Sequence, residues 1–231
     1  MTRPLPLSHR RAFVQRHTRL RDVEGVPGIR LHLADEVEPV WHATEEALGL
    51  GEAGAPIPFW AFAWAGGLAL AGWLLEHPDE VRGRRVLDFA AGSGLVAIAA
   101  ARAGAAHVLA VDVDPFAEAA VALNAKANRA HVTYAGRDLL ADAPPEDVDV
   151  LLAADTWYEG PLAARVLPWL RAAAARGTRV LVADPGRKYL PDPAATGLET
   201  LAIREVHATT TLEDREVIAS TVYTLREPAA G

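Results

Sequence analysis

The sequence predicts an α/β protein in which helices cover both faces of a doubly wound, seven-stranded, mostly parallel sheet that ends in an antiparallel hairpin. Three observations predict this architecture. From Arg85 onward, short runs rich in β-branched residues alternate with segments of helical periodicity, as in successive βαβ units. The first run leads through a glycine-rich turn directly into a helix. The last two runs follow each other without room for a full helix, so we expect them to pair as a hairpin at the sheet edge.

The seven expected strands all lie in the C-terminal part of the chain. They are Arg85–Phe89, His107–Val111, His131–Ala135, Asp147–Ala153, Thr178–Ala183, Glu199–Ala208 and Glu216–Leu225. Prolines mark the starts of two of the helices between them. Pro115 fits the first helical position after an Asp114 N-cap, and Pro161 can open a helix that Gly177 closes.

A chain of 231 residues, 51% hydrophobic and 23% charged, is long enough for one substantial domain and short for two. We expect an N-terminal extension at residues 1–57, with a helix and short strands, and one larger domain at residues 58–231. In the extension, Ile29, Leu31 and Leu33 alternate with other residues as in a half-buried strand. Residues 49–58 are expected to form a loop.

The charge and composition argue against several classes of function. A net charge of −7 disfavours nucleic-acid binding, which usually needs a clustered basic face. No apolar stretch approaches a membrane span and no secretory signal is evident, so we predict a cytoplasmic protein, and we expect it to be a monomer. The chain has no cysteine and its eight histidines are scattered, so we expect no metal site.

A cluster of arginines near the start has two interpretations. It is either one face of a solvated amphipathic helix or a docking surface for a macromolecular partner. Its members are Arg3, Arg10, Arg11, Arg16, Arg19 and Arg21.

The first strand of the expected sheet ends in Asp88 and runs into a turn that contains Ala90, Gly92 and Gly94. Glycines let the backbone approach a ligand closely, and the following helix presents unpaired N–H groups at its N-terminus. Such a turn could hold a dinucleotide or an adenosyl cofactor. The nicotinamide fingerprint is Gly-x-Gly-x-x-Gly, whereas this turn reads Asp-x-Ala-x-Gly-x-Gly, which favours the adenosyl cofactor.

Two further acids follow the next two strands. Asp112, followed by Val113, lies 24 positions beyond Asp88 and could accept hydrogen bonds from both ribose hydroxyls. Asp138, followed by Leu139, comes after the third strand. Three acids at successive strand ends indicate an adenosyl site more strongly than any one of them.

Together these residues resemble motif I and the following acidic motifs of class I S-adenosylmethionine-dependent methyltransferases, which have a Rossmann-like fold. The resemblance implies S-adenosyl-L-methionine as the cofactor. It places Asp138 and Leu139 near the adenine amino group. Ala90 occupies the position where this family usually has its first glycine, and alanine fits there if its φ is negative.

After the fourth strand comes Asp155-Thr156-Trp157-Tyr158, at the edge of the sheet where ligands bind in open α/β folds. This segment is similar to the Asp-x-x-Tyr element of the seven-β-strand protein-lysine methyltransferases. The resemblance extends to the electron transfer flavoprotein β-subunit lysine methyltransferases over residues 58–189. It includes Pro58-Phe59-Trp60-Ala61, Gly66-Gly67, Asp112-Val113-Asp114-Pro115, Asn124, Asn128 and Asp184-Pro185-Gly186-Arg187. It implies methyl transfer to lysine ε-nitrogens of that flavoprotein subunit.

The resemblance and the chemistry suggest a role for each residue of this segment. Asp155 could hold the incoming ammonium and then its amine, and Tyr158 could orient that amine through its hydroxyl. Trp157 could stack on the cationic side chain. Alternatively, Trp157 and Tyr158 simply cap the sheet.

The aromatic and small residues before the first strand of the sheet also have candidate roles. Trp60 and Trp64, four positions apart, are expected to share a helix face, where they either form a wall of the adenosyl pocket or pack in the core. Gly66 and Gly67 resemble the place where the family's backbone approaches the cofactor carboxylate.

Two other functions remain open from the residues alone. One is a small-molecule amine N-methyltransferase with the same cofactor site. The other is a non-catalytic adenosyl-binding module, which Asp155 and Tyr158 disfavour because a binder needs no polar groups at the strand end that faces the methyl group.

Overall fold

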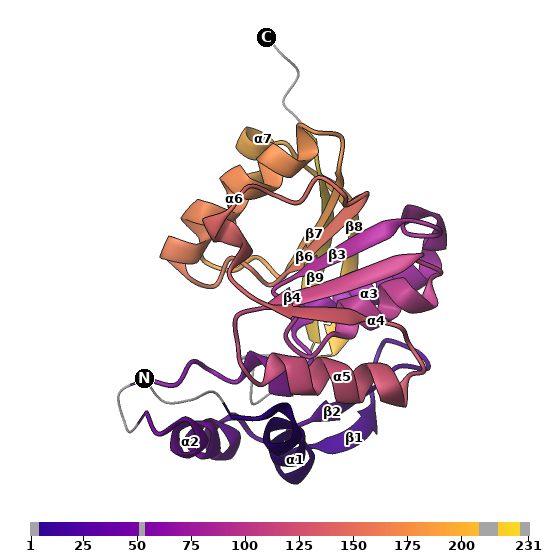
Figure 1. Cartoon of the computed structure of the whole chain (residues 1–231). Coiled ribbons are helices and arrows are strands. Elements are labelled where there is room, and N and C mark those ends of the chain that lie inside the picture. Colours follow the sequence, from indigo (N-terminus) through magenta and orange to yellow (C-terminus); the bar gives the residue numbers. More distant parts are fainter. Residues whose placement is uncertain (1–4, 51–53, 208–216, 227–231) are drawn as a thin grey trace.

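The computed structural model describes residues 5–50, 54–207 and 217–226, and its main feature is one seven-stranded sheet (Figure 1). The strand order is β5-β4-β3-β6-β7-β9-β8. The strands are β3 (Arg85–Phe89), β4 (His107–Asp112), β5 (Thr133–Gly136), β6 (Val150–Ala154), β7 (Arg179–Asp184), β8 (Leu198–His207) and β9 (Val217–Leu225). All seven predicted strands are confirmed to within a few residues. The predicted ends at Ala208 and Glu216 lie outside the described residues.

The sheet is parallel from β5 to β7 and antiparallel where β9 pairs with β7 and β8. The chain winds outward from β3, which has β4 on one side and β6 on the other. This reversal of strand order opens a crevice at the carboxyl ends of β3 and β6, where ligands bind in folds of this kind. The predicted doubly wound fold with an antiparallel C-terminal hairpin is therefore confirmed.

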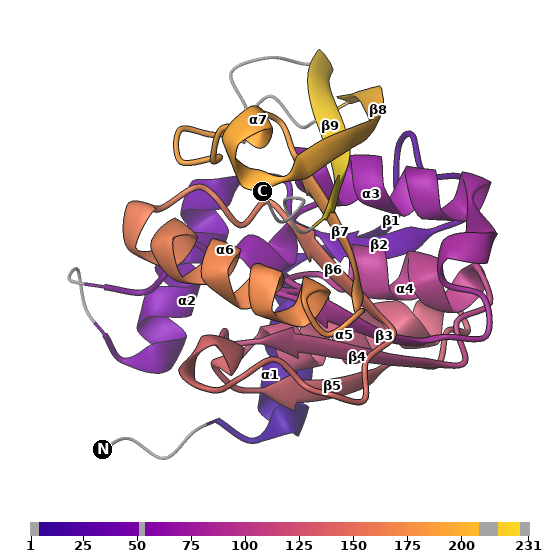
Figure 2. The same ribbon diagram turned by 90° about the horizontal axis from the view of Figure 1, so that it is seen from above.

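Helices cover both faces of the sheet (Figure 2). One face packs against α3 (Ala65–Glu76), α4 (Leu95–Arg102) and α5 (Ala117–Ala127), and the other against α6 (Gly160–Ala174). The central strands read as nearly continuous apolar runs because both of their faces are buried; Leu151 and Leu152, for example, point to opposite layers. The short helix α7 (Pro193–Thr196) precedes β8.

The starts of two helices bear on the predicted residues. Helix α3 begins at Ala65, so the glycine pair Gly66 and Gly67 lies in its first turn. Helix α5 begins at Ala117, not at Pro115. Asp114 is not its N-cap, because the carboxylate of Asp114 accepts a hydrogen bond from Phe116 N at 2.7 Å and so closes a turn ahead of the helix.

Trp60 and Trp64 do not share a helix face, contrary to the sequence prediction. Trp60 lies in the short 3₁₀ helix η2 (Phe59–Ala61). Trp64 is the N-cap of α3, and the intervening Phe62 has an extended backbone with φ −138°. The helical spacing is therefore interrupted between the two tryptophans.

The first part of the chain forms a layer beside α5 (Figure 1). It comprises α1 (Leu7–His17), a two-stranded antiparallel sheet of β1 (Arg19–Asp22) and β2 (Arg30–Leu33), and α2 (Val37–Leu48). The predicted strand around Leu31 is confirmed as β2. Val14 of α1 and Val40 of α2 pack in one apolar cluster with Trp60 and Phe116.

Arg10 in the N-terminal arginine cluster bonds to α5 and the loop before it, through Glu118 at 2.7 Å and the carbonyl oxygen of Pro115. Arg11, Arg16, Arg19 and Arg21 are exposed, and Arg3 lies outside the described residues. Within the parts of the chain that the structure describes, no helix combines the length and apolar character needed to cross a membrane.

Candidate active site

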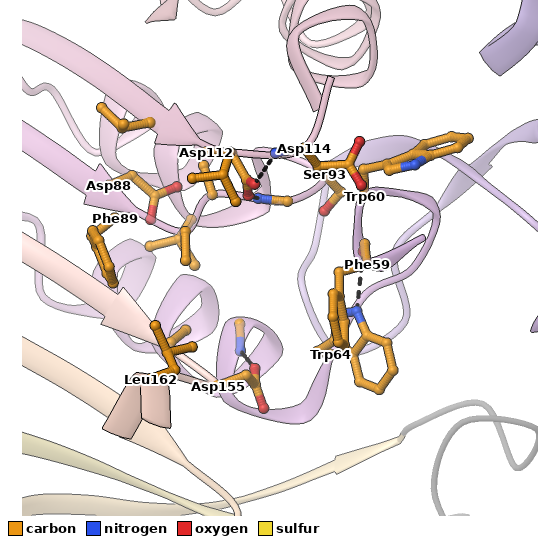
Figure 3. A pocket seen from close by; sticks show the side chains of 18 of the residues that line it. Phe59, Trp60, Trp64, Asp88, Phe89, Ser93, Asp112, Asp114, Asp155 and Leu162 are labelled. Atoms are coloured by element: carbon orange, nitrogen blue, oxygen red, sulfur yellow. Dashed lines mark hydrogen bonds between the residues drawn. The ribbon is translucent and has the colours of Figure 1, made fainter. Parts of the chain in front are cut away.

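A cavity of about 290 Å³ lies at the carboxyl ends of the parallel strands (Figure 3). Its walls come from the loops after β3, β4, β5, β6 and β7, together with η2 and the start of α3. The lining residues are Pro56, Phe59, Trp60, Phe62, Trp64, Gly67, Asp88–Ser93, Leu95, Val96, Val111–Pro115, Arg137–Leu140, Ala154, Asp155, Tyr158, Leu162 and Arg187. Most of the predicted site residues therefore meet in one cavity. Gly66, Gly94 and Trp157 do not line it.

The turn between β3 and α4 is built from left-handed residues. Ala90 has φ 56°, Gly92 has φ 51° and Gly94 has φ 80°. The condition under which alanine replaces glycine without strain, a negative φ, is therefore not met at Ala90, and this alanine carries a strain of roughly 1 kcal/mol. Gly94 serves the helix entry and not the cavity, because a Cβ there would lie 3.0 Å from a methyl carbon of Val121.

Asp88 is buried beneath this turn and completes the N-terminus of α4. Gly94, the N-cap, has no side chain, and Asp88 Oδ2 instead accepts a hydrogen bond from Ala97 N at 2.9 Å. Burial raises the pKa of Asp88 to about 8, an effect that the neighbouring Asp112 reinforces. Asp88 therefore shapes the turn from below while also lining the cavity.

The raised pKa of Asp88 predicts a pH-dependent stability. Since the folded chain holds this proton up to about pH 8 while an unfolded aspartate loses it near 3.8, stability falls as pH rises between those values. Asp88→Asn keeps the acceptor for Ala97 N and removes this titration. We expect the variant to gain stability over the wild type by roughly 1 kcal/mol per pH unit between pH 5 and pH 8, measured by urea unfolding without cofactor.

Other buried acids in the region lower the stability of both proteins alike as pH rises. Burial raises the pKa of Asp114 to about 7 and that of Asp184 to about 6. The difference between Asp88→Asn and wild type therefore isolates Asp88. A difference in unfolding free energy that stays constant from pH 5 to pH 8 would contradict the assignment.

Asp112, at the end of β4, ties two loops of the cavity together. Its Oδ2 accepts from Gly92 N at 2.8 Å and its Oδ1 accepts from Asp114 N at 2.9 Å. Burial raises its pKa. The next residue, Val113, lines the cavity and is 70% exposed. Asp112 therefore lies where the buried strand ends and the cavity opens to solvent.

Asp138 and Leu139 form the wall after β5. Asp138 caps the short helix η4 (Leu139–Ala141) by accepting from Leu140 N at 2.9 Å, and it pairs with Arg165 at 2.8 Å. This ion pair lowers the pKa of Asp138. Leu139 is buried and supplies an apolar surface, so this wall combines a fixed carboxylate with an aliphatic side chain.

Asp155, directly after β6, has both carboxylate oxygens engaged. Oδ2 accepts from Gly67 N at 2.8 Å, and Oδ1 accepts from the Arg187 guanidinium at 3.0 Å. The same guanidinium lies 5.6 Å from the centre of the Trp64 ring. Burial raises the pKa of Asp155, and Arg187 opposes that rise. Asp155 is therefore part of a fixed acid, cation and aromatic group, not an isolated carboxylate awaiting an ammonium.

The two glycines at the start of α3, Gly66 and Gly67, have different roles. Gly67 lines the cavity. A Cβ on Gly66 would lie 2.6 Å from Ala183 O and 2.7 Å from Asp155 Oδ2, so Gly66 is required by protein packing. Of the two glycines predicted to face the cofactor, only Gly67 lines the cavity.

Trp157 and Tyr158 point in opposite directions. Trp157 is fully buried among the side chains beneath α6, so it cannot stack on a substrate cation as predicted, and it instead fits the alternative of capping the sheet. Tyr158 lines the cavity, is 42% exposed and packs on Phe59 with ring centres 4.8 Å apart. Burial raises the pKa of Tyr158, which keeps its hydroxyl protonated.

Trp60 both lines the cavity and belongs to the core, so its two interpretations combine. Its ring lies 5.8 Å from that of Phe116, and its buried indole N–H has no hydrogen-bond partner among the described residues. Trp64 donates its own indole N–H to Phe59 O at 3.1 Å. Two adjacent aromatic walls therefore form.

The cavity also has wall residues that the predicted site did not include, among them Phe59, Phe62, Arg137, Leu162 and Arg187. The Asp184-Pro185-Gly186-Arg187 turn at the end of β7 was the only signal for Arg187. No group of three or more acidic or histidine side chains that could hold a metal occurs within residues 5–50, 54–207 and 217–226.

The cavity fits S-adenosyl-L-methionine. A buried carboxylate is held at the end of β4, and aliphatic and aromatic surfaces line the interior. A doubly wound sheet with these acids at its strand ends defines a class I S-adenosylmethionine-dependent methyltransferase.

Comparisons with known proteins agree with this class and refine it. The family model for ribosomal protein L11 methyltransferase (PrmA) matches residues 73–154. An electron transfer flavoprotein beta subunit lysine methyltransferase from Xenopus laevis is 34% identical over 215 residues, covering 92% of this chain and 85% of that protein. The Rattus norvegicus counterpart is 42% identical over 171 residues, covering 65% and 67%.

The chain therefore belongs to the electron transfer flavoprotein β-subunit lysine methyltransferase family. It is an S-adenosylmethionine-dependent protein-lysine N-methyltransferase, and the predicted family, enzyme class and cofactor are confirmed. Among solved structures, magnesium protoporphyrin IX methyltransferase from Synechocystis PCC 6803 with bound S-adenosylmethionine shares the fold. Its TM-score is 0.50 at 14% identity, covering 69% of this chain and 77% of that one.

Proposed function

We propose that this enzyme methylates lysine residues of the electron transfer flavoprotein β subunit. The observation that carries the proposal is that Tyr158 and the paired Asp155 and Arg187 all line the cavity, in a chain whose relatives are named for that subunit. The aromatic lining of the cavity suits one extended side chain delivered from a protein surface.

We propose that the cofactor lies along the glycine turn, with Asp112 accepting from its ribose. Asp138 and Leu139 would hold the adenine. Gly67 and the buried Asp88 would border the methionine portion. Asp112 supports this assignment because its two bonds to backbone N–H groups hold the carboxylate at the cavity wall.

The remaining residues would receive the acceptor lysine. When bound, S-adenosylmethionine supplies a methyl group on a sulfonium sulfur; a neutral amine can attack this methyl carbon, so that the N–C bond forms, the C–S bond breaks and the sulfur leaves as a thioether. The protein therefore has to align the lysine nitrogen and keep it unprotonated. The Arg187 guanidinium and the buried surroundings both disfavour an ammonium ion there, which lowers the pKa of an entering lysine.

In this arrangement Asp155 acts differently from the role first assigned to it. Because Gly67 N and Arg187 already bond to its two oxygens, Asp155 would orient the lysine amine through one remaining lone pair and fix Arg187 in place. The protonated hydroxyl of Tyr158 would be the second orienting group.

The direct test incubates the purified enzyme with labelled S-adenosylmethionine and the recombinant flavoprotein β subunit, followed by peptide mass spectrometry. We expect methyl groups on lysines of that subunit. The control is the subunit with its surface lysines acetylated. Labelling of free amines without labelling of the flavoprotein β subunit would contradict the proposal and favour a small-molecule N-methyltransferase.

We also propose that residues 1–57 are an extension to a methyltransferase domain at residues 58–231. The enzyme would work as a cytoplasmic monomer and would not bind nucleic acid. The net charge of −7 supports the last point.

A further inference from the structure

A single buried side chain connects the glycine turn to the N-terminal layer. Asn124 lies in the middle of α5 and has no exposed surface. Its Nδ2 donates to Ser93 O at 2.9 Å, and its Oδ1 accepts from His32 N at 2.7 Å. Ser93 lies between Gly92 and Gly94 and lines the cavity, whereas His32 belongs to β2. Both ends of the amide are therefore used, one on each part of the chain.

The glycine turn needs such external support. Its residues at φ 56°, 51° and 80° occupy left-handed conformations that persist only when surrounding contacts hold them. Bonds from Ala91 N to Val111 O and from Gly92 N to Asp112 fix the side of the turn that faces β4. The bond from Asn124 fixes the opposite side, through the Ser93 carbonyl.

A second asparagine, one helical turn later, provides an internal comparison. Asn128 accepts from Arg30 N at 2.9 Å and donates to Arg30 O at 2.6 Å, so it also bonds to β2. Among the described residues, the side chain of Asn128 has no hydrogen bond to the glycine turn; its other bond goes to Asn124 O at 2.8 Å. Asn128 thus shares the attachment of β2 but lacks the connection to Ser93.

We propose that Asn124 is a positioning residue that couples the docking of the N-terminal layer to cofactor affinity. With β2 docked, the backbone N–H of His32 holds the amide of Asn124 in the orientation that directs its NH₂ group at Ser93 O. The glycine turn then has its cofactor-binding conformation before the cofactor arrives. Less conformational entropy is therefore lost when the cofactor binds. This inference rests on the assignment of the cofactor to this cavity.

The test measures S-adenosylhomocysteine binding by calorimetry for Asn124→Asp and Asn128→Asp. Asn124→Asp keeps the acceptor for His32 N but places an oxygen against Ser93 O. We expect its Kd to rise by about tenfold or more, the effect of losing one hydrogen bond and leaving a buried acceptor unpaired. Asn128→Asp instead loses the donor to Arg30 O of β2 and leaves the bond from Asn124 to Ser93 O in place, so it reports the effect of weakened docking, and we expect its Kd to rise several-fold less.

A second measurement separates positioning from general stability. Coupling is reciprocal, so cofactor binding should slow hydrogen exchange at His32 N in the wild type and in Asn128→Asp, but not in Asn124→Asp. Asn124→Ala replaces Asn124→Asp if the latter does not fold. Equal Kd values for both asparagine variants, or unchanged exchange at His32 in the wild type, would overturn the proposal. Neither readout involves an acceptor, so failure to methylate the flavoprotein subunit leaves this test intact.

Discussion

Asp155→Asn should lower kcat for lysine methylation by about 100-fold or more, while S-adenosylmethionine still binds with an affinity close to that of the wild type. The substitution keeps the size of the side chain and one acceptor for Gly67 N. It removes the negative charge that holds the Arg187 guanidinium 3.0 Å away. Arg187 would then lose the carboxylate to which it donates, and the lysine amine would lose the charged acceptor that orients it.

The measurement is steady-state methylation of the flavoprotein subunit together with calorimetric titration of the cofactor. Asp149→Asn is the matched control, because Asp149 also pairs with an arginine, Arg85, but at the opposite ends of the strands. We expect wild-type kcat from it. If Asp155→Asn loses cofactor affinity as much as kcat, Asp155 belongs to the cofactor site instead.

Asp112→Ala should weaken cofactor binding by about 100-fold. The change removes the acceptor for Gly92 N at 2.8 Å and the proposed acceptor for the ribose hydroxyls. Hydrogen bonds to a charged group each contribute about 1.5 to 3 kcal/mol, and a loss of about 2.7 kcal/mol corresponds to that change in Kd. The glycine turn also loses an anchor, so the effect combines a lost contact with a lost conformation.

Calorimetry with S-adenosylhomocysteine measures this effect without any acceptor. Asp138→Asn is the comparison, because the carboxylate of Asp138 is about 44% exposed and already paired with Arg165, so its loss should cost much less affinity. An Asp112→Ala protein that binds as tightly as Asp138→Asn would refute the ribose assignment.

The fold could be predicted because its strands and helices have clear periods. Buried parallel strands appear as continuous apolar runs, and the carboxyl ends of parallel strands meet at one edge. That geometry alone placed Asp88, Asp112 and Asp155 in a common site. The hydrogen bonds that each acid makes could not be predicted from the sequence. The two partners of Asp155, for example, are Gly67 N and Arg187, and both lie far from it along the chain.

The incorrect predictions concern residues whose orientation or conformation no periodic pattern in the sequence determines. Trp157 and Tyr158 follow β6 in a segment that is neither strand nor helix, so no spacing rule indicates which side chain faces the cavity. The φ of Ala90 is set by the whole turn and overrides the preference of alanine. Gly66 was assigned to the cofactor by resemblance, yet the crowding that requires a glycine comes from Ala183 and Asp155.

The place of β9 in the sheet has a consequence for synthesis of the chain. This strand is the last of the seven to be made, yet it lies between β7 and β8. While the ribosome is still completing residues 217–225, β7 has one unpaired edge and β8 has no partner in the sheet. An open edge on a nearly finished sheet can pair with another chain. Until β9 pairs, the folding chain therefore carries an open strand edge at β7, and β9 covers that edge.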